Sequence, residues 1–301
     1  MKQRKKVNAM AEIIDYTTVN IVGYDNWYSD FPWTRYNGKL KKLKITHNNL
    51  DDEGITYFIK DGVYEILKDY HSRIKVALLT ECRFFDPRRH AFVEENIDKF
   101  DYIVTYDDVL IEKFKEKVIV VPNGGSWISH PQIHPKTKLC SYMVSTKSMT
   151  EQQRTRVSLL RFFRRNREIN ISLYGRGHNP LCENHANESD GKLEAYKDYA
   201  FSLAMENHRQ HNYFSEKLMD CLLTGTIPVY CGCLDIDKYF NVDGMILFDT
   251  EDEAKNIINT LKLSMYDTKL DAVRENFELA KRYTDSLSCS YSLLEDMRVF
   301  K

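Results

Sequence analysis

The amino-acid sequence predicts an α/β protein built from two doubly wound, Rossmann-like domains that face each other across a cleft. Two observations support this prediction. Strand-like and helix-like segments alternate in two successive series, as expected of two parallel sheets with helices on both faces. Between the series, Pro122-Asn-Gly-Gly125 interrupts the pattern with turn-forming residues. We therefore expect domains at residues 1–125 and 126–285 and a helical tail at 286–301, with one large α/β domain as the alternative.

The composition is that of a folded protein and excludes several classes. The 301 residues are 43% hydrophobic and 12% aromatic, which is enough for a sizeable core. The formal net charge is -1, so no overall field favours nucleic acid or a membrane surface. We find no signal peptide and no apolar run long enough to span a membrane, and we expect a cytoplasmic protein. The 7 cysteines are expected to be reduced and mostly buried.

The first series contains a carboxylate at a position that suggests catalysis. Its predicted strands span residues 19–23, 74–80, 102–105 and 118–121, and its predicted helix spans 107–115. Glu81 directly follows the second of these strands, so it should face the cleft, where ligands of such sheets bind. A glutamate there can accept a proton from an attacking hydroxyl as a general base. A helix cap or a salt-bridge partner is the alternative role.

The second series is longer and ends in helices. Its predicted strands span 139–144, 169–174, 199–205 and 226–231, and its predicted helices span 150–166, 216–224, 251–263 and 270–283. Thr150 and Gln153 have the spacing of a capping box, which predicts that a helix begins there. This helix and the helix at 216–224 both follow strands, so both N-termini should open onto the same crevice.

Residues 206–217 form a polar loop between a strand and a helix, which indicates a site for an anionic ligand such as a nucleotide diphosphate. Ser215 is the expected N-cap of the helix. Lys217 and Arg154 are expected to hold the diphosphate together, because positive groups stabilise the charge of such a leaving group. Each of them alone could equally be a solvated surface charge.

Other side chains of the same loop suit the uncharged parts of a nucleotide sugar. Glu216 can accept hydrogen bonds from ribose or sugar hydroxyls, because adjacent helix residues point in different directions and only Lys217 faces the phosphates. Glu206 and Asn207 can bind hydroxyls or buttress the loop. Tyr213 can contact the nucleoside, or it can simply pack on the domain.

The second half resembles the family 10 glycosyltransferases, the α-1,3/1,4-fucosyltransferases. The resemblance rests on a series of motifs over about 100 residues: Tyr142-Met-Val-Ser145, Arg154-Thr-Arg156, Leu173-Tyr-Gly-Arg176, Tyr196 to Asn207, Tyr213-Phe-Ser-Glu-Lys217 and Thr226 to Gly232. In the first half, Thr80-Glu81 and Phe100 to Val104 match less closely.

The resemblance implies the two-domain fold called GT-B and transfer of fucose from GDP-fucose to a glycan hydroxyl, with inversion and without a metal. Glu81 matches the proposed base, and Arg154 and Lys217 match groups on the diphosphate. Asn207, Tyr213 and Glu216 match positions around the nucleoside and the sugar. Ser145, Tyr174 and Gly175, in the matching motifs, are expected to belong to the same donor site, together with Glu206.

Three other functions are consistent with the sequence. A metal-dependent glycosyltransferase of another fold would use an Asp-x-Asp motif, which Asp235-Ile-Asp237 fits. A GT-B enzyme could use a different nucleotide sugar. A relative without activity could bind only a nucleotide or a sugar.

Overall fold

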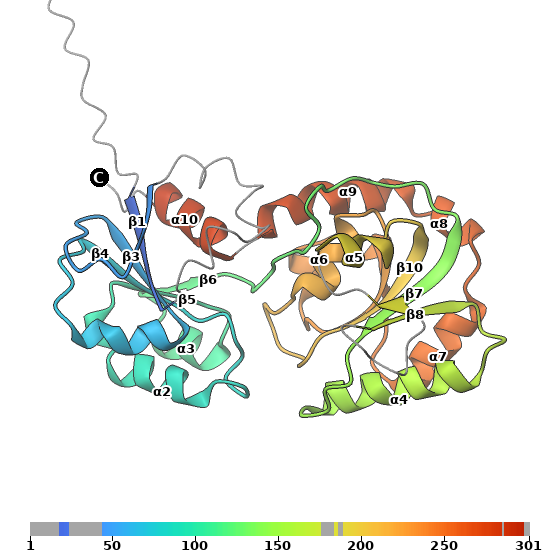
Figure 1. Cartoon of the computed structure of the whole chain (residues 1–301), viewed down its shortest axis with the longest axis horizontal. Coiled ribbons are helices and arrows are strands. Elements are labelled where there is room, and N and C mark those ends of the chain that lie inside the picture. Colours follow the sequence, from blue (N-terminus) through green and yellow to red (C-terminus); the bar gives the residue numbers. More distant parts are fainter. Residues whose placement is uncertain (1–17, 24–43, 176–183, 186–188, 285, 298–301) are drawn as a thin grey trace, which may run out of the picture.

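The computed structural model describes residues 18–23, 44–175, 184–185, 189–284 and 286–297. The described chain forms two lobes, each built around a 6-stranded sheet (Figure 1). Every strand pair in both sheets is parallel. This confirms the predicted doubly wound α/β class. Residues 1–17 and 298–301 of the predicted first domain and tail, and Arg176 of the matching motifs, lie outside the described residues.

The first sheet has the strand order β2-β1-β3-β4-β5-β6. Its strands are β1 (Thr18–Val22), β2 (Lys44–His47), β3 (Ile55–Ile59), β4 (Ile74–Leu78), β5 (Tyr102–Thr105) and β6 (Val118–Val120). Because β2 and β3 lie on opposite sides of β1, the strand order reverses there. Sheets of this kind bind ligands outside the carboxyl ends of their strands, near the reversal.

Helices cover both faces of the first sheet. Side chains of η3 (Lys60–Leu67), α2 (Pro87–Glu95) and α3 (Asp108–Lys113) join one apolar cluster, which includes Val63, Val93 and Leu110. The opposite face is covered from the far end of the chain, because Leu287 and Leu294 of α10 (Ser286–Asp296) pack against its strands. A short 3-10 turn, η4 (Ile97–Lys99), precedes β5.

The second sheet repeats this plan with the order β12-β11-β10-β7-β8-β9. Its strands are β7 (Lys138–Val144), β8 (Ile171–Gly175), β9 (Asn184–His185), β10 (Tyr199–Met205), β11 (Ile227–Cys231) and β12 (Ile246–Leu247). Its order reverses between β7 and β10. The loops after these two strands, 145–149 and 206–215, therefore lie side by side at the expected ligand edge.

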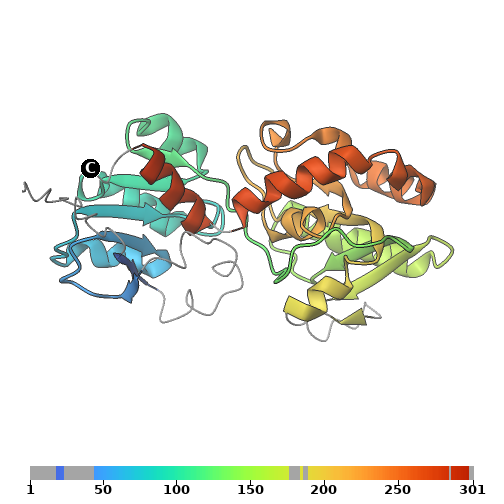
Figure 2. The ribbon, with the colours of Figure 1, turned by 90° about the horizontal axis from the view of Figure 1, so that it is seen from above.

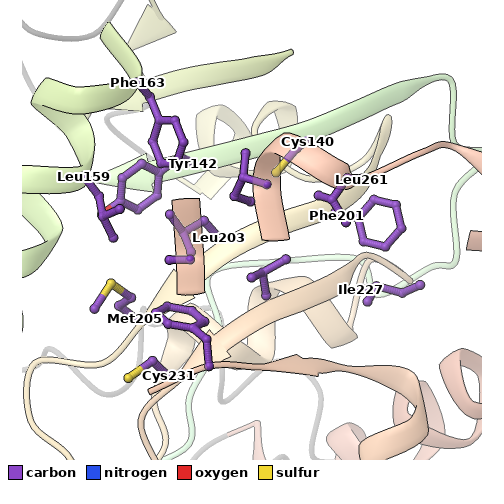
Figure 3. Packing of buried hydrophobic residues seen from close by; sticks show 14 of the residues in the cluster. Cys140, Tyr142, Leu159, Phe163, Phe201, Leu203, Met205, Ile227, Cys231 and Leu261 are labelled. Atoms are coloured by element: carbon purple, nitrogen blue, oxygen red, sulfur yellow. The ribbon is translucent and has the colours of Figure 1, made fainter. Parts of the chain in front are cut away.

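Two helical layers enclose the second sheet. The helices α4 (Glu151–Arg165) and α7 (Glu251–Thr260) pack on one face, where Tyr142 and Phe163 meet edge to face at 6.4 Å (Figure 3). The helices α5 (Ser189–Glu194) and α6 (Glu216–Leu222) lie on the other. The helix α9 (Leu270–Ala280) contributes to both cores. The remaining pieces are short: η5 (Ile236–Lys238), η6 (Val242–Gly244), α8 (Ser264–Asp267) and η7 (Lys281–Tyr283).

Most predicted elements are present, and the best-specified boundary is the start of α4. The Thr150 side chain accepts from the Gln153 amide and Gln153 reaches back to the Thr150 amide, so the predicted capping box is confirmed. The sequence analysis did not predict β2, β3, η3 or α2. All five residues of β3 are buried, so it lacks the alternating pattern of a half-exposed strand.

Two segments cross between the lobes, one after β6 and one before α10 (Figure 2). Hydrogen bonds join them to each other and to the second lobe. The Gly125 amide donates to the Tyr283 carbonyl at 2.9 Å, and the Gly124 amide donates to the Phe214 carbonyl at 2.8 Å. Gly124 has a left-handed backbone, with φ 56°, and a Cβ there would lie 2.3 Å from the Tyr283 carbonyl oxygen. Glycine is therefore required at this crossing.

The cysteines of the described chain agree with the expectation that they are reduced and mostly buried. Cys82, Cys140, Cys221, Cys231 and Cys233 are buried free thiols and Cys289 is half-buried, whereas Cys182 lies outside the described residues. None of the described helices combines the length and the apolar character needed to cross a bilayer.

Candidate active site

The loop before α6 is fixed by a buried carboxylate. Glu206 directly follows β10 and is fully buried, and its two oxygens accept from the Ser215 amide at 2.8 Å and from the Ser215 hydroxyl at 2.5 Å. Ser215 is the N-cap of α6, as predicted. Gly232 makes room for this arrangement, since a Cβ there would lie 2.4 Å from Glu206 Cγ. Glu206 therefore buttresses the loop, the second of its two expected roles, and offers no surface to a ligand.

Lys217 and Glu216 form a partly exposed ion pair at the start of α6. Lys217 Nζ lies 3.0 Å from Glu216 Oε1, 3.0 Å from Ser215 Oγ and 3.7 Å from Glu206 Oε2. Burial alone would lower the pKa of Lys217, but Glu216 and Glu206 outweigh it and raise this pKa. Burial likewise opposes ionisation of Glu216, yet Lys217 and Lys192 lower its pKa to about 2. Both side chains are therefore charged at neutral pH.

The second positive charge of this site comes from Arg156. This residue is 5% exposed, and its guanidinium donates to the Met205 carbonyl at 3.2 Å and to Asn207 Oδ1 at 2.9 Å. Its Nε is buried without a partner among the described residues. The positive charge of Arg156 also reaches Lys217, where it opposes part of the rise in the Lys217 pKa. An unpaired buried donor beside a lysine is an arrangement that an anionic ligand can complete.

Arg154, the arginine chosen from the sequence, is placed differently. Its side chain is exposed, and it donates to the Met149 carbonyl at 3.1 Å on the outside of the helix start. The structure thus buries Arg156 within electrostatic reach of Lys217, whereas Arg154 lies exposed. Helical spacing could have shown this, because Gln153, Arg156 and Leu160 all lie in the buried stripe of α4 while Arg154 lies off it.

Glu81, in the first lobe, lies near the charged residues at the start of α6. It lies three residues beyond the end of β4, and its surface is exposed in part. Partial enclosure raises the pKa of Glu81, whereas Lys60 and, from the other lobe, Lys217 lower it less strongly. Glu81 thus lies within electrostatic reach of Lys217 and Glu216, as the sequence led us to expect. Lys60 was not anticipated; it has a left-handed φ of 50° at the end of β3.

Direct contacts join the two lobes beside these charges. The rings of Tyr106 and Tyr213 are 4.9 Å apart, and Gln210 Nε2 donates to the Tyr106 carbonyl at 3.1 Å. Tyr213 is only 6% exposed and packs with Tyr106 and Cys82. This is the packing role named above as the alternative, so a ring open to a nucleoside is not what the structure shows for Tyr213.

The remaining predicted donor residues divide into two groups. Asn207, Ser145 and Gly175 lie at the carboxyl ends of β10, β7 and β8, at the expected ligand edge. Tyr174 precedes Gly175 in β8, but its side chain is buried and its hydroxyl lies 3.0 Å from that of Tyr199, the first residue of β10. The Tyr174 hydroxyl is therefore directed away from the ligand edge, and the assignment of Tyr174 to the donor site stays a prediction.

Asp235 of the Asp-x-Asp motif has a structural role. One carboxylate oxygen accepts from the Asn212 amide at 2.7 Å, and the other lies 2.9 Å from Lys238 Nζ. Asp235 thereby holds the end of the 206–213 loop, which contains a left-handed residue at Asn212.

Comparison with known families identifies the family of this chain. Residues 133–288 match the family described as glycosyltransferase family 10 (fucosyltransferase), C-terminal part, and this match covers more than half of the sequence. The chain belongs to glycosyltransferase family 10. Its matched region contains Arg156, Asn207, Glu216 and Lys217, whereas Glu81 lies before it.

Curated relatives agree with the family. A putative fucosyltransferase of Acanthamoeba polyphaga mimivirus is 29% identical over 172 residues, which is 49% of this chain and 28% of that protein. The chain thus spans well under half the length of this curated relative, and the matches to two others cover 18% of their length.

Solved structures of low sequence identity share the fold. A crystal structure of an α1,3-fucosyltransferase with GDP is 17% identical and has a TM-score of 0.55, over 93% of this chain and 90% of that chain. A crystal structure of Anabaena HepE with UDP-glucose is 9% identical and has a TM-score of 0.61, over 94% and 99%. This family 10 protein therefore has the predicted GT-B fold.

Proposed function

We propose that this protein transfers fucose from GDP-fucose to a hydroxyl group of a glycan, with inversion at the anomeric carbon. The observation that carries the proposal is that Glu81 of the first lobe lies within electrostatic reach of Lys217 and Glu216 of the second. A base and a cation on opposite sides of a sugar are what an in-line displacement requires. Membership of family 10 and the GT-B fold support it.

In the proposed reaction, the acceptor oxygen attacks the anomeric carbon and forms the new glycosidic bond. The bond from that carbon to the β-phosphate oxygen breaks, and its electron pair leaves with GDP. The acceptor hydroxyl gives its proton to Glu81. Because the pKa of Glu81 is raised above its ordinary value, the carboxylate is a better proton acceptor than a fully solvated glutamate.

The leaving diphosphate needs positive charge, and we assign this role to Lys217 and Arg156. Lys217 is held by Ser215 and Glu216, and the unpaired Nε of Arg156 is a donor already in place. Groups fixed before the reaction stabilise developing charge without reorganising. In this proposal no metal is required, and activity should persist in excess EDTA. Loss of activity in EDTA and its recovery with Mn²⁺ would reject this part.

Recognition of hydroxyl groups is assigned to Glu216 and Asn207. Asn207 Oδ1 is engaged by Arg156, while within the described chain its amide nitrogen makes no bond and can donate to a ligand. Glu216 stays ionised and can accept from ribose or sugar hydroxyls. Ser145 and Gly175 complete the rim at the ends of the neighbouring strands.

A donor screen tests this function. The protein is incubated with GDP-fucose, GDP-mannose, UDP-glucose and UDP-galactose and a panel of saccharide acceptors, and the products are identified by mass. We expect an increase by one fucose with GDP-fucose alone. Turnover with another donor would favour a different nucleotide sugar, an alternative supported by the likeness to HepE, which was crystallised with UDP-glucose. Binding of GDP without any turnover would favour a non-catalytic relative.

A further inference from the structure

An aromatic ring lies open to solvent beside the proposed base. Phe84 is three residues beyond Glu81, and its side chain is 59% exposed. Single exposed apolar side chains are common on proteins. Phe84 differs from such cases because it is rigidly held, because it lies where the two lobes meet, and because it shares a short loop with Glu81.

The loop that carries Phe84 is fixed from within. The amides of Phe85 and Asp86 both donate to the Cys82 carbonyl, at 3.0 and 3.1 Å. Phe85 turns inward and packs against Cys82, Tyr106 and Tyr213, and it meets the Phe84 ring edge to face at 5.3 Å. Arg83 anchors the loop through Asp107 at 2.6 Å. Of these two adjacent aromatic residues, Phe84 is exposed and Phe85 points into the protein.

The opposite lobe contributes a second ring. His208, in the loop after β10, lies almost parallel to Phe84, with the centroids 6.4 Å apart and 12° between the planes. His208 follows Asn207, which contacts Arg156, so the aromatic pair borders the donor site. Most of the Phe84 surface remains uncovered in this arrangement.

We propose that Phe84 is the binding platform for the acceptor sugar and that it determines which hydroxyl reaches Glu81. The axial C–H groups of a pyranose ring form an apolar, slightly positive face, which packs well on the negative face of an aromatic ring. The donor is held by charges of the second lobe, whereas Phe84 shares its loop with the base that contacts the acceptor. This inference rests on the proposed glycosyl transfer.

The test separates acceptor binding from donor binding. Phe84→Ala, Phe84→Tyr and the parent are compared with GDP-fucose and N-acetyllactosamine, and donor hydrolysis by water is measured in parallel. Loss of one stacking contact should raise the KM for the acceptor about tenfold. Hydrolysis and the KM for GDP-fucose should stay within about twofold, because the diphosphate site is untouched, and Phe84→Tyr should restore the KM for the acceptor.

Leu67→Ala is the matched control, since Leu67 is 63% exposed in the same lobe but lies at the end of η3. An unchanged KM for the acceptor in Phe84→Ala, or an equal rise in Leu67→Ala, would overturn the inference.

A second measurement distinguishes this failure from failure of the proposed function. Saturation transfer from the GDP-bound protein to methyl β-galactoside and methyl β-N-acetylglucosaminide needs no turnover. We expect transfer to the C–H groups of one sugar face in the parent and its loss in Phe84→Ala. Equal transfer in both, or none in the parent, contradicts the platform even if fucose is transferred.

Discussion

At the scale of single residues, Glu81 is subject to opposing influences. Enclosure raises its pKa, and the positive charges of Lys60 and Lys217 oppose this rise. Two of these groups belong to the first lobe and one to the second, so the proton affinity of the proposed base depends on both. A carboxylate placed in this way can be tested by removing its charge and by changing the pH.

Glu81→Gln keeps the size of the side chain but removes the base. We expect the rate of fucosyl transfer to fall about 10²–10⁴-fold, the usual contribution of a general base. The affinity for GDP, measured by calorimetry, should hardly change, because Lys217 and Arg156 remain. A variant that retains the full transfer rate would show that Glu81 is not the base.

The pH dependence of the transfer rate follows from the same carboxyl group. Only ionised Glu81 accepts a proton, so activity is lost as the pH falls through the pKa of Glu81 in the folded protein. Since that pKa is raised from the ordinary 4.5, the acid limb should lie above pH 4.5. The raised pKa of Lys217 keeps that side chain charged, so it adds no loss below about pH 10. An acid limb at or below 4.5 contradicts the assignment.

Two arginines on one helix provide a matched pair. Arg156→Met should lower kcat/KM for the donor about 10²-fold, the effect of removing one group that stabilises a leaving charge. Arg154→Met should change it little, because that side chain is exposed. Arg156→Lys should recover part of the loss, which separates the effect of charge from that of packing. If the two methionine variants lower kcat/KM for the donor equally, Arg156 is not distinguished from Arg154, and Arg154 becomes a candidate for the diphosphate site again.

At the scale of elements, two capping boxes with a threonine N-cap lie in different surroundings. Thr150 begins α4 and Thr250 begins α7. Thr150 is buried and also donates to the Asn207 carbonyl at 2.7 Å, while Thr250 is exposed. Thr150→Ala and Thr250→Ala should each lower the free energy of unfolding by about 1 kcal/mol. Only Thr150→Ala should raise the KM for the donor, and a similar rise in both variants would contradict the tie to Asn207.

Elements with strong local signals were predictable from the sequence, and those defined by tertiary contacts were not. The Thr150 and Gln153 spacing placed the start of α4 correctly, whereas β3 was missed because both of its faces are buried. In the site, the strand ends predicted where Glu81 and the 206–217 loop lie in the fold, and their roles stay a prediction. The burial of Arg156 was also encoded, in the helical spacing of α4, whereas the directions of the Tyr174 and Tyr213 side chains depend on what packs against them and have no local sequence signal.

At the scale of the whole molecule, the relation of the lobes is set where two segments cross. Gly124 contacts Tyr283 of one segment and Phe214 beside the N-cap of α6. The covalent connection between the lobes is therefore bonded directly to the loop that positions Lys217. We propose residues 1–125 and 126–285 as the two domains, with the helix of the tail packed on the first.

Gly124→Ala tests this connection. The left-handed backbone alone costs about 1–2 kcal/mol for a residue with a Cβ, and the approach to Tyr283 adds to it. We expect lower thermal stability, a changed small-angle scattering profile and reduced transfer. Gly225→Ala is the control, because Gly225 has φ 70° but its Cβ would meet Ile133 within the second lobe. If both variants leave the scattering profile unchanged, the crossing does not set the lobe arrangement.

The position of α10 in the chain has a consequence for folding during synthesis. During synthesis the strands of the first sheet leave the ribosome early, while Leu287, Tyr291 and Leu294, which cover one of its faces, leave only after the entire second lobe. Until then Val19, Ile21 and Tyr57 present an uncovered apolar surface. The first lobe can therefore complete its core only after a helix encoded more than 150 residues beyond its last strand has been made, and until then its open apolar face is prone to aggregation.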